Sequence, residues 1–462
     1  MSAHGWFPVT LKAHGFYRTL EPLFDRGEVE AFTDGEPFSR QAADGFGMFL
    51  GSVGGRRLGV VACDFRVAGA SFGKASSRRL LAFVRAMGQS RTPIFFQLHT
   101  MGVRLTEGRT VFHDAFQLIP ALSGFAARNL LITSVHGNCL GLGAILYGLG
   151  HAQYAVTGKS FNLTGPEVFK MFFGEKVDYQ AATGVERVSQ HTEQIHELVP
   201  TSEHVYAKVR ALLTGVPDAE AAPLPPKLTA LLATCADDAV EVLASKKPGL
   251  WALVARQGTR RFGLIAPEPG RPNLLTVDGI AKCRAALKLF ARMRLPVVSL
   301  VDTAGTDPRL EQSDRNVTGE LVALGEAIAA HRHGLLGVVV GRAFGGASLL
   351  AFPRSFGSDR VLALQGARID IMDPKIVGAL VSGSARLREQ WDAVVASQGD
   401  GLGDLVEAGI IDGVISAAGL RGAVRQFLEA RARPLSGVVP LPASARSLYA
   451  DDDVEITAGG RA

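Results

Sequence analysis

Hydrophobic and polar positions along the chain follow two alternating patterns. In residues 78–89 and 285–295 apolar side chains recur every three or four positions, which predicts helices with one buried face. Each of these segments leads to a proline and then to a short, continuous apolar run. Such runs are typical of parallel strands that are buried on both faces. Strands that alternate with helices favour an α/β fold.

The same order of segments occurs twice. Equivalent prolines and glycines are separated by 203 or 204 residues, namely Pro93 and Pro296, Gly102 and Gly305, and Gly141 and Gly345. Three agreeing separations over such a distance indicate a duplicated unit. The sequence therefore predicts two tandem α/β domains with an active site shared between the copies.

The duplication also predicts the domain boundaries. The first domain is expected at residues 1–213 and the second at 236–433. Between them, residues 214–235 include a proline-rich stretch that is typical of a linker. After about residue 434 the apolar periodicity is lost, which predicts a frayed tail over 434–462.

Composition narrows the class of protein. The 462 residues are 47% hydrophobic and carry a formal net charge of +5. No apolar run approaches the roughly 18–20 residues of a membrane span, and no secretory signal pattern opens the chain. The four cysteines are far apart, so neither a zinc ribbon nor a disulfide framework is expected. We expect a cytoplasmic protein that binds no metal, nucleic acid or membrane.

Two short basic groups, Lys74–Arg79 and Arg256–Arg261, interrupt the otherwise dispersed charge. A solvated surface is the default interpretation of such groups. Recognition of a small anion, such as a nucleotide phosphate, is the alternative.

The segment Val135–Tyr154 places Gly137, Gly141 and Gly143 ahead of a helix-like apolar run. Glycine inside a helix costs roughly 0.5–1 kcal/mol relative to alanine, so the cluster needs a reason. Close packing against a sheet is one explanation. The other is an anion or oxyanion that approaches the free N–H groups at a helix start.

Several motifs, in order and at matching spacings, resemble one family. These are MGVRLTEG (Met101–Gly108), NLTGPEV (Asn162–Val168), VDTAG (Val301–Gly305), GRAFGGA (Gly341–Ala347) and VEAGIIDGVI (Val406–Ile415). The chain resembles the carboxyltransferase β subunits of acyl-CoA carboxylases and, more distantly, the carboxyltransferase subunits of malonate decarboxylases. The resemblance covers most of the chain.

The resemblance implies two crotonase-like β-β-α spiral domains, with helices that begin near Gly141 and Gly345. It implies transfer of a carboxyl group between carboxybiotin on a separate carrier protein and the α-carbon of an acyl-CoA, with no covalently bound cofactor. Backbone N–H groups would stabilise the enolate and the biotin oxyanion, and the residues implied as catalytic are Gly141, Leu142, Gly346 and Ala347. Those implied as substrate-binding are Met101, Gly102, Gly143, Gly305, Gly345 and Leu349.

The same resemblance implies a biotin carboxylase or biotin carrier subunit as partner, or an acyl carrier protein, and a homodimer or hexamer. Several positions depart from the family pattern. Met101 stands where a glycine is usual, and the serine and glycine of the family's SGVAH segment are lost while His196 is kept. Leu142 stands where a glycine is usual, so its side chain is expected to fill space that a ligand would use. His99 and Leu349 each stand where an aspartate is common.

These departures leave other activities open. A biotin-independent decarboxylase of a malonyl-CoA or malonyl-carrier thioester would use the same oxyanion sites, and a non-catalytic paralogue is the third hypothesis. The scattered histidines are interpreted as structural, Asp302 and Thr303 as turn-forming, and Cys139 as small and buried.

Overall fold

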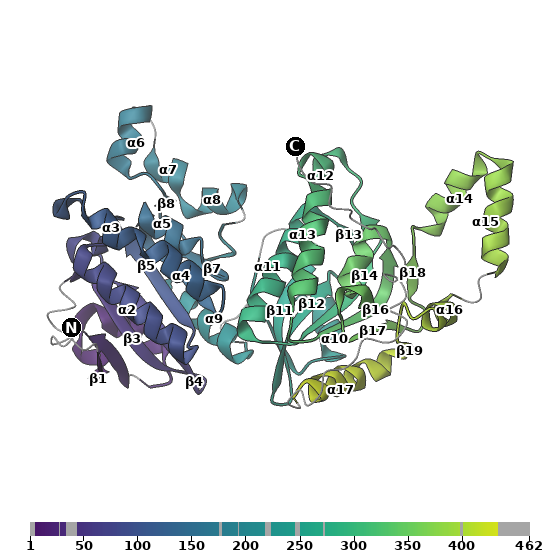
Figure 1. The fold of residues 1–462 in the computed structure, drawn as a ribbon, viewed down its shortest axis with the longest axis horizontal. Helices are drawn as coiled ribbons and strands as arrows, with labels where there is room; N and C mark the ends of the chain where they lie inside the picture. The colour runs from purple at the N-terminus through teal and green to yellow at the C-terminus, as the bar shows by residue number, and fades with distance from the viewer. Residues whose placement is uncertain are drawn as a thin grey trace, which may run out of the picture.

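The computed structural model describes residues 5–26, 28–33, 44–174, 178–192, 194–217, 223–244, 250–270, 273–397 and 401–432. It contains two halves that lie side by side, each built on its own sheet (Figure 1). The predicted duplication is therefore visible as two α/β units. The predicted tail, residues 434–462, lies outside the described residues.

The described part of the first half forms a sheet in the order β1-β2-β3-β4-β5-β6-β7-β9, with β8 paired to β6. Pairing is antiparallel up to β4 and parallel from β4 onward. The strands are β1 (Gly5–Thr10), β2 (Glu28–Thr33), β3 (Phe46–Val53), β4 (Arg56–Cys63), β5 (Ile94–Thr100), β6 (Leu131–Leu140), β7 (Ala152–Val156), β8 (Phe161–Asn162) and β9 (Glu197–Val199).

The second half repeats this plan in the order β10-β11-β12-β14-β16-β17-β19, with β18 paired to β16. Its strands are β10 (Asp238–Glu241), β11 (Leu250–Gln257), β12 (Arg260–Pro267), β14 (Val297–Thr303), β16 (Leu335–Phe344), β17 (Arg360–Leu364), β18 (Arg368–Asp370) and β19 (Gly413–Ile415). The short strands β13 (Leu274–Leu275) and β15 (Gly305–Thr306) pair separately.

Helices connect the parallel strands. In the first half they are α2 (Lys74–Ser90), α3 (Val111–Phe116), α4 (Leu118–Ala126), α5 (Leu142–Tyr147), α6 (Pro166–Phe173), α7 (Tyr179–Thr183), α8 (Val185–His191) and α9 (Ser202–Thr214). In the second half they are α10 (Pro226–Ala233), α11 (Val277–Met293), α12 (Leu310–Asp314), α13 (Val317–Ala330), α14 (Pro374–Ser382), α15 (Ala385–Ser397), α16 (Leu402–Glu407) and α17 (Leu420–Ala432).

The repeat extends to local irregularities. The helices predicted from periodicity are α2 and α11, which have 17 residues each and end on arginines with left-handed backbones, Arg91 and Arg294. The register of β5 on β6 shifts between Leu98 and Thr100, and that of β14 on β16 shifts between Val301 and Thr303. Both halves therefore turn sharply at the same place, just before the glycines that the sequence singled out.

The predicted linker, 214–235, is only partly irregular. Its last third forms α10, which starts at Pro226, and proline is compatible with the first turn of a helix. Leu228 and Leu232 lie on one face of this helix and pack into the core of the second half together with Cys235. The apolar spacing of these residues outweighed the proline-rich composition, so this part of the predicted linker belongs to the second unit.

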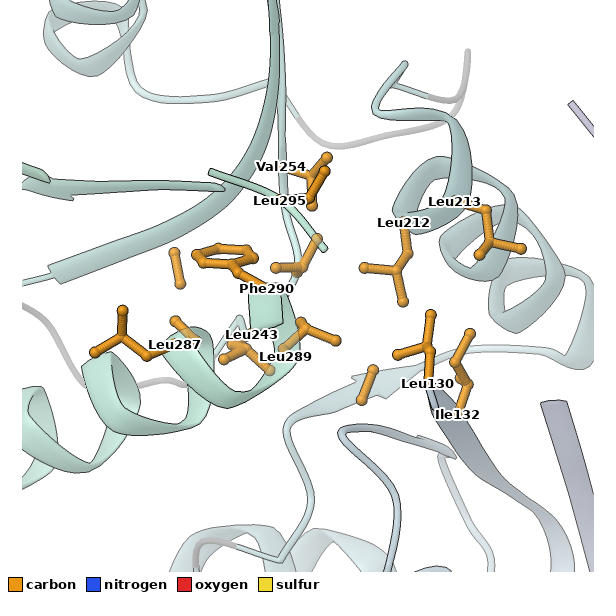
Figure 2. Packing of buried hydrophobic residues seen from close by; sticks show 14 of the residues in the cluster. Leu130, Ile132, Leu212, Leu213, Leu243, Val254, Leu287, Leu289, Phe290 and Leu295 are labelled. Carbon is orange, nitrogen blue, oxygen red and sulfur yellow. The ribbon is translucent and has the colours of Figure 1, made fainter. Parts of the chain in front are cut away.

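A continuous hydrophobic core joins the two halves. Figure 2 shows Leu130, Ile132, Leu212 and Leu213 of the first half near residues of the second half, and all belong to one buried cluster. The labelled residues on the other side are Leu243, Val254, Leu287, Leu289, Phe290 and Leu295. Burial of about 1.5–3 kcal/mol per large apolar side chain makes this junction a strong one.

Two helical arms extend from the halves, α6 with α7 from the first and α14 with α15 from the second (Figure 1). Large apolar side chains on the first arm are strongly exposed, with Met171 at 85% and Phe172 at 79%. On the second arm Leu380 is 61% exposed. Exposed apolar surface of this kind is typical of a contact surface.

Candidate functional site

The first half-site lies where the chain turns after β5 and after β6. Gly102 has a φ of +88° and Gly141 a φ of +54°, values that side chains strongly disfavour. A Cβ on Gly102 would lie 3.2 Å from the carbonyl oxygen of Leu140, so the two turns also approach closely. Met101, beside them, is 46% exposed. The sequence-predicted residues of the first half therefore meet at the carboxyl ends of β5 and β6.

Amide groups at the start of α5 are the candidate donors of this half-site. The N–H of Gly141 donates to the carbonyl oxygen of Asn162 at 3.1 Å, so it is already used in this structure. The helix begins at Leu142. Leu142 and Gly143 occupy its first two positions, where N–H groups lack an intrahelical acceptor. The free N–H groups at this helix start are therefore those of Leu142 and Gly143, and not that of Gly141.

The side chain of Leu142 packs inside the protein. It is 3% exposed and belongs to the hydrophobic core of the first half, whereas its departure from the family pattern leads us to expect it in space that a ligand would use. Gly143 and Gly137 are required by packing, because a Cβ would lie 2.4 Å from Thr100 Cγ2 and 2.2 Å from the His99 ring, respectively. Close packing therefore explains Gly137 and Gly143, and the positive φ of Gly141 explains the third glycine.

The second half-site has the same design at the end of β16. Gly305 and Gly345 have φ values of +116° and +57°. A helix begins at Gly345 as predicted, but it is the 3-10 helix η6 (Gly345–Ala351) rather than an α-helix. Gly346 is exposed, whereas Ala347 is buried. Gly346 falls in the first turn, where its N–H has no acceptor within the helix, whereas the N–H of Ala347 is placed to donate to the carbonyl of the N-cap residue Phe344.

Two threonines that sequence inspection did not select as site residues hold the turns in place. The hydroxyl of Thr100 donates to the Ala70 carbonyl at 2.6 Å, and that of Thr303 donates to the Asn273 carbonyl at 2.7 Å. The same hydroxyl oxygens accept the N–H groups of Gly102 at 3.1 Å and of Gly305 at 3.4 Å. Their separation of 203 residues was a visible signal, since it matches the repeat.

The residues beneath the two turns differ in chemistry. His99 stacks on Phe65 with ring centroids 4.0 Å apart, and burial, with the charge of Lys159, lowers its pKa to about 4. At the equivalent position, Asp302 accepts the backbone N–H and Nε of Arg342 at 3.0 and 2.9 Å. A stacked aromatic ring thus lies beneath one turn and a partly exposed ion pair beneath the other.

A cavity of about 750 Å³ adjoins the first half-site. It is lined by residues of β8 and of α6 to α8, which include Asn162, Phe169, Asp178 and Arg187. A much smaller cavity of about 20 Å³ lies below the second turn, beside Thr303 and Leu350. Leu349, expected at the acyl pocket, is half-buried and packs against the core. Each cavity is lined by one half alone.

Other expectations concern groups away from the turns. The four cysteines are free and buried, and burial raises the pKa of the Cys139 thiol well above its usual value. Within the described ranges, no three or more His, Cys, Asp or Glu side chains gather in a group that could hold a metal ion. In the same part of the chain, every helix is too short or too polar to cross a bilayer.

Comparison with known proteins identifies the family. The family described as "Carboxyl transferase domain" matches residues 17–248 and 252–433. The chain therefore belongs to the carboxyl transferase family, which confirms the resemblance seen in its motifs.

Individual relatives agree with this assignment. A "Probable biotin-dependent acyl-coenzyme A carboxylase beta3 subunit" of Mycobacterium tuberculosis is 24% identical over 444 residues, which are 85% of this chain and 87% of the relative. A "Methylmalonyl-CoA carboxyltransferase 12S subunit" of Propionibacterium freudenreichii is 24% identical and covers 71% of this chain and 68% of its own.

The solved structure of a transcarboxylase 12S hexamer superimposes with a TM-score of 0.77 at 21% identity, covering 92% of this chain and 91% of the other. This likeness confirms the predicted fold, two tandem crotonase-like units.

Proposed function

We propose that this chain moves a carboxyl group between carboxybiotin, delivered by a separate carrier protein, and the α-carbon of an acyl-CoA. The observation that carries the proposal is the duplicated arrangement of helix-start amides at Leu142–Gly143 and Gly346–Ala347. The names of the relatives, which include acyl-CoA carboxylase β subunits, support the same activity.

The reaction requires two oxygens to be stabilised, the enolate oxygen of the thioester and the ureido oxygen of biotin. Carboxybiotin supplies the carboxyl group and, once that group has left, a base for the α-proton. This chain's part is to bind and orient both partners and to aim backbone N–H groups at the two oxygens. Donors placed in this way are worth about 2.7–4 kcal/mol each.

The acyl-CoA belongs in the first half under this proposal. Its cavity of about 750 Å³ is within the size range of ligand pockets, and Arg187 offers a positive charge there. The second half then receives biotin. Gly346 is exposed and has no side chain to cover its amide, so this end of the helix can be approached.

Both ligands must come together for the transfer, yet each cavity is lined by only one half of the chain. We therefore propose a homo-oligomer in which the first half of one copy faces the second half of another. The exposed apolar side chains of the α6 and α14 arms, such as Phe172 and Leu380, supply surface for this contact. A monomer by light scattering at micromolar concentration would contradict it.

The experiment that tests the activity is incubation of the pure protein with malonyl-CoA, with and without free biotin, while CO2 release is followed. Release that requires biotin is the expected result. Release of CO2 without biotin would overturn the proposal and favour the decarboxylase. No turnover on any acyl-CoA or malonyl thioester, for a folded oligomer supplied with biotin, would favour the non-catalytic hypothesis.

A further inference from the structure

A basic cleft of about 180 Å³ opens at the junction of the two halves. The first half lines it with arginines at four positions, Arg56, Arg57, Arg91 and Arg128. The second half adds three more, Arg261, Arg292 and Arg294. Arg261 belongs to one of the two basic groups seen in the sequence, and the proposed carboxyl transfer makes no use of it.

Most of this charge is not balanced by the protein. Within the described residues, Arg57 pairs with Glu30 at 2.7 Å, and the other six arginines have no carboxylate partner. The Nε of Arg292 is buried and has no hydrogen-bond acceptor there either. Burial, with the charge of Arg56, lowers the pKa of Arg261 to about 10. Like charges held this close without a counter-ion are unfavourable, so the cleft favours an anion.

The duplication itself builds the cleft. Arg56 and Arg57 begin β4 at the β3–β4 hairpin, and Arg261 lies at the start of β12 in the equivalent β11–β12 hairpin. Arg91 and Arg294 are the equivalent left-handed residues that end α2 and α11, with φ values of +53° and +56°. The arrangement is therefore set by backbone elements rather than by flexible loops.

These residues all lie at the amino ends of the parallel strands. Arg91 precedes β5, Arg128 precedes β6, and Arg294 precedes β14. The candidate half-sites lie at the opposite, carboxyl ends of the same strands. The cleft is thus a separate site, and its occupant is not a substrate of the proposed reaction.

We propose that this cleft binds a small phosphate-bearing anion with at least two negative charges, such as a pyrophosphate group, free or as part of a nucleotide. Guanidinium groups match phosphate oxygens in pairs of parallel hydrogen bonds. The small volume suits such a group. Because both halves contribute arginines, the bound anion joins them.

The test is isothermal titration of the full-length protein with inorganic pyrophosphate, and separately with ADP, at low ionic strength. Arg294→Asn removes one charge at a left-handed position that asparagine tolerates, so the fold should persist. We expect pyrophosphate binding that weakens with salt and falls about tenfold in this variant. If ADP binds more tightly than pyrophosphate, the site is assigned to a nucleotide. If ADP binds equally or more weakly, the site is assigned to free pyrophosphate.

Arg386→Gln is the matched control, because Arg386 is exposed on α15, in the arm that Figure 1 shows at the outer end of the second half. It changes net charge equally and should leave binding unchanged. Failure of both anions to bind at millimolar concentration would overturn the proposal. Equal losses in Arg294→Asn and Arg386→Gln would also overturn it, since binding would then depend on net charge alone. The proposal would also be overturned if Arg294→Asn changed the oligomeric state and no anion bound, because the cleft would then be a contact between copies.

Discussion

The two helix starts that follow β6 and β16 occupy equivalent places in the repeat but use opposite side chains. Leu142 is buried in the core of the first half, whereas its counterpart Gly346 is exposed, and a Cβ there would make only ordinary contacts at 3.6 Å. The first segment is an α-helix and the second a 3-10 helix, so what they share is the turn on a glycine with positive φ, Gly141 or Gly345. The comparison teaches that the repeat keeps the backbone turn while the side-chain packing beside it differs.

The largest effect is expected from Leu142→Gly, which would make the first half resemble the second. Because the leucine is buried, its removal should destabilise the protein by about 2–5 kcal/mol, without a gain in carboxyl transfer. Chemical denaturation together with a turnover assay measures both. A stable variant with raised activity would show that Leu142 obstructs the ligand after all.

The next largest effect is a loss of turnover, and the variant that produces it tests the proposed amide donor at the second helix start. Gly346→Pro removes an N–H, so turnover should fall by about 10²–10³ if that N–H stabilises an oxyanion. Gly346→Ala keeps the N–H and its Cβ fits, with the nearest atoms 3.6 Å away, so it is the matched control. Rates are compared at saturating acyl-CoA after circular dichroism shows both variants folded. Normal turnover in Gly346→Pro would remove this residue from the proposed mechanism.

The third prediction is that the stability of the two halves depends differently on pH. Burial lowers the pKa of His99, His151 and His196 of the first half to about 4 and that of His136 to about 3. The unfolded chain binds these protons near pH 6.5, so stability is full above that pH and declines as the pH falls toward 4. Each fully buried histidine contributes at most about 1.4 kcal/mol per pH unit.

In the second half, burial lowers the pKa of His331 to about 4 and also lowers that of His333. With fewer such groups, this half should lose less stability in acid. Hydrogen exchange at pH 5 should therefore show β6 opening more readily than β16, a difference absent at pH 7. Equal protection of the two strands at both values would contradict the prediction.

The smallest change in stability is expected from breaking the ion pair beneath the second turn. Asp302 and Arg342 form a partly exposed ion pair, with side-chain exposures of 26% and 33%. Such pairs contribute about 0–1 kcal/mol, so Arg342→Gln should barely change the free energy of unfolding. Thermal denaturation at low and high salt measures it. A loss of several kcal/mol would mean that the ion pair, and not Thr303, holds the turn.

Sequence pattern was sufficient for the architecture because it is periodic and repeated. Residues three and four apart predicted α2 and α11, and separations of 203 and 204 predicted equivalent turns at Gly102 and Gly305. Motifs were sufficient for the family. These signals are local or recur along the chain, so they can be recognised without knowing the tertiary contacts.

Tertiary packing decided the rest. It turned the Leu142 side chain into the core, engaged the N–H of Gly141 with Asn162, and joined seven arginines from two halves in one cleft. Each outcome depends on contacts between residues far apart in the chain, and a glycine's conformation does not reveal which neighbour approaches it. The direction in which a side chain points, and the acceptor that an amide N–H finds, are therefore decided only in the folded molecule, because only folding brings those neighbours together.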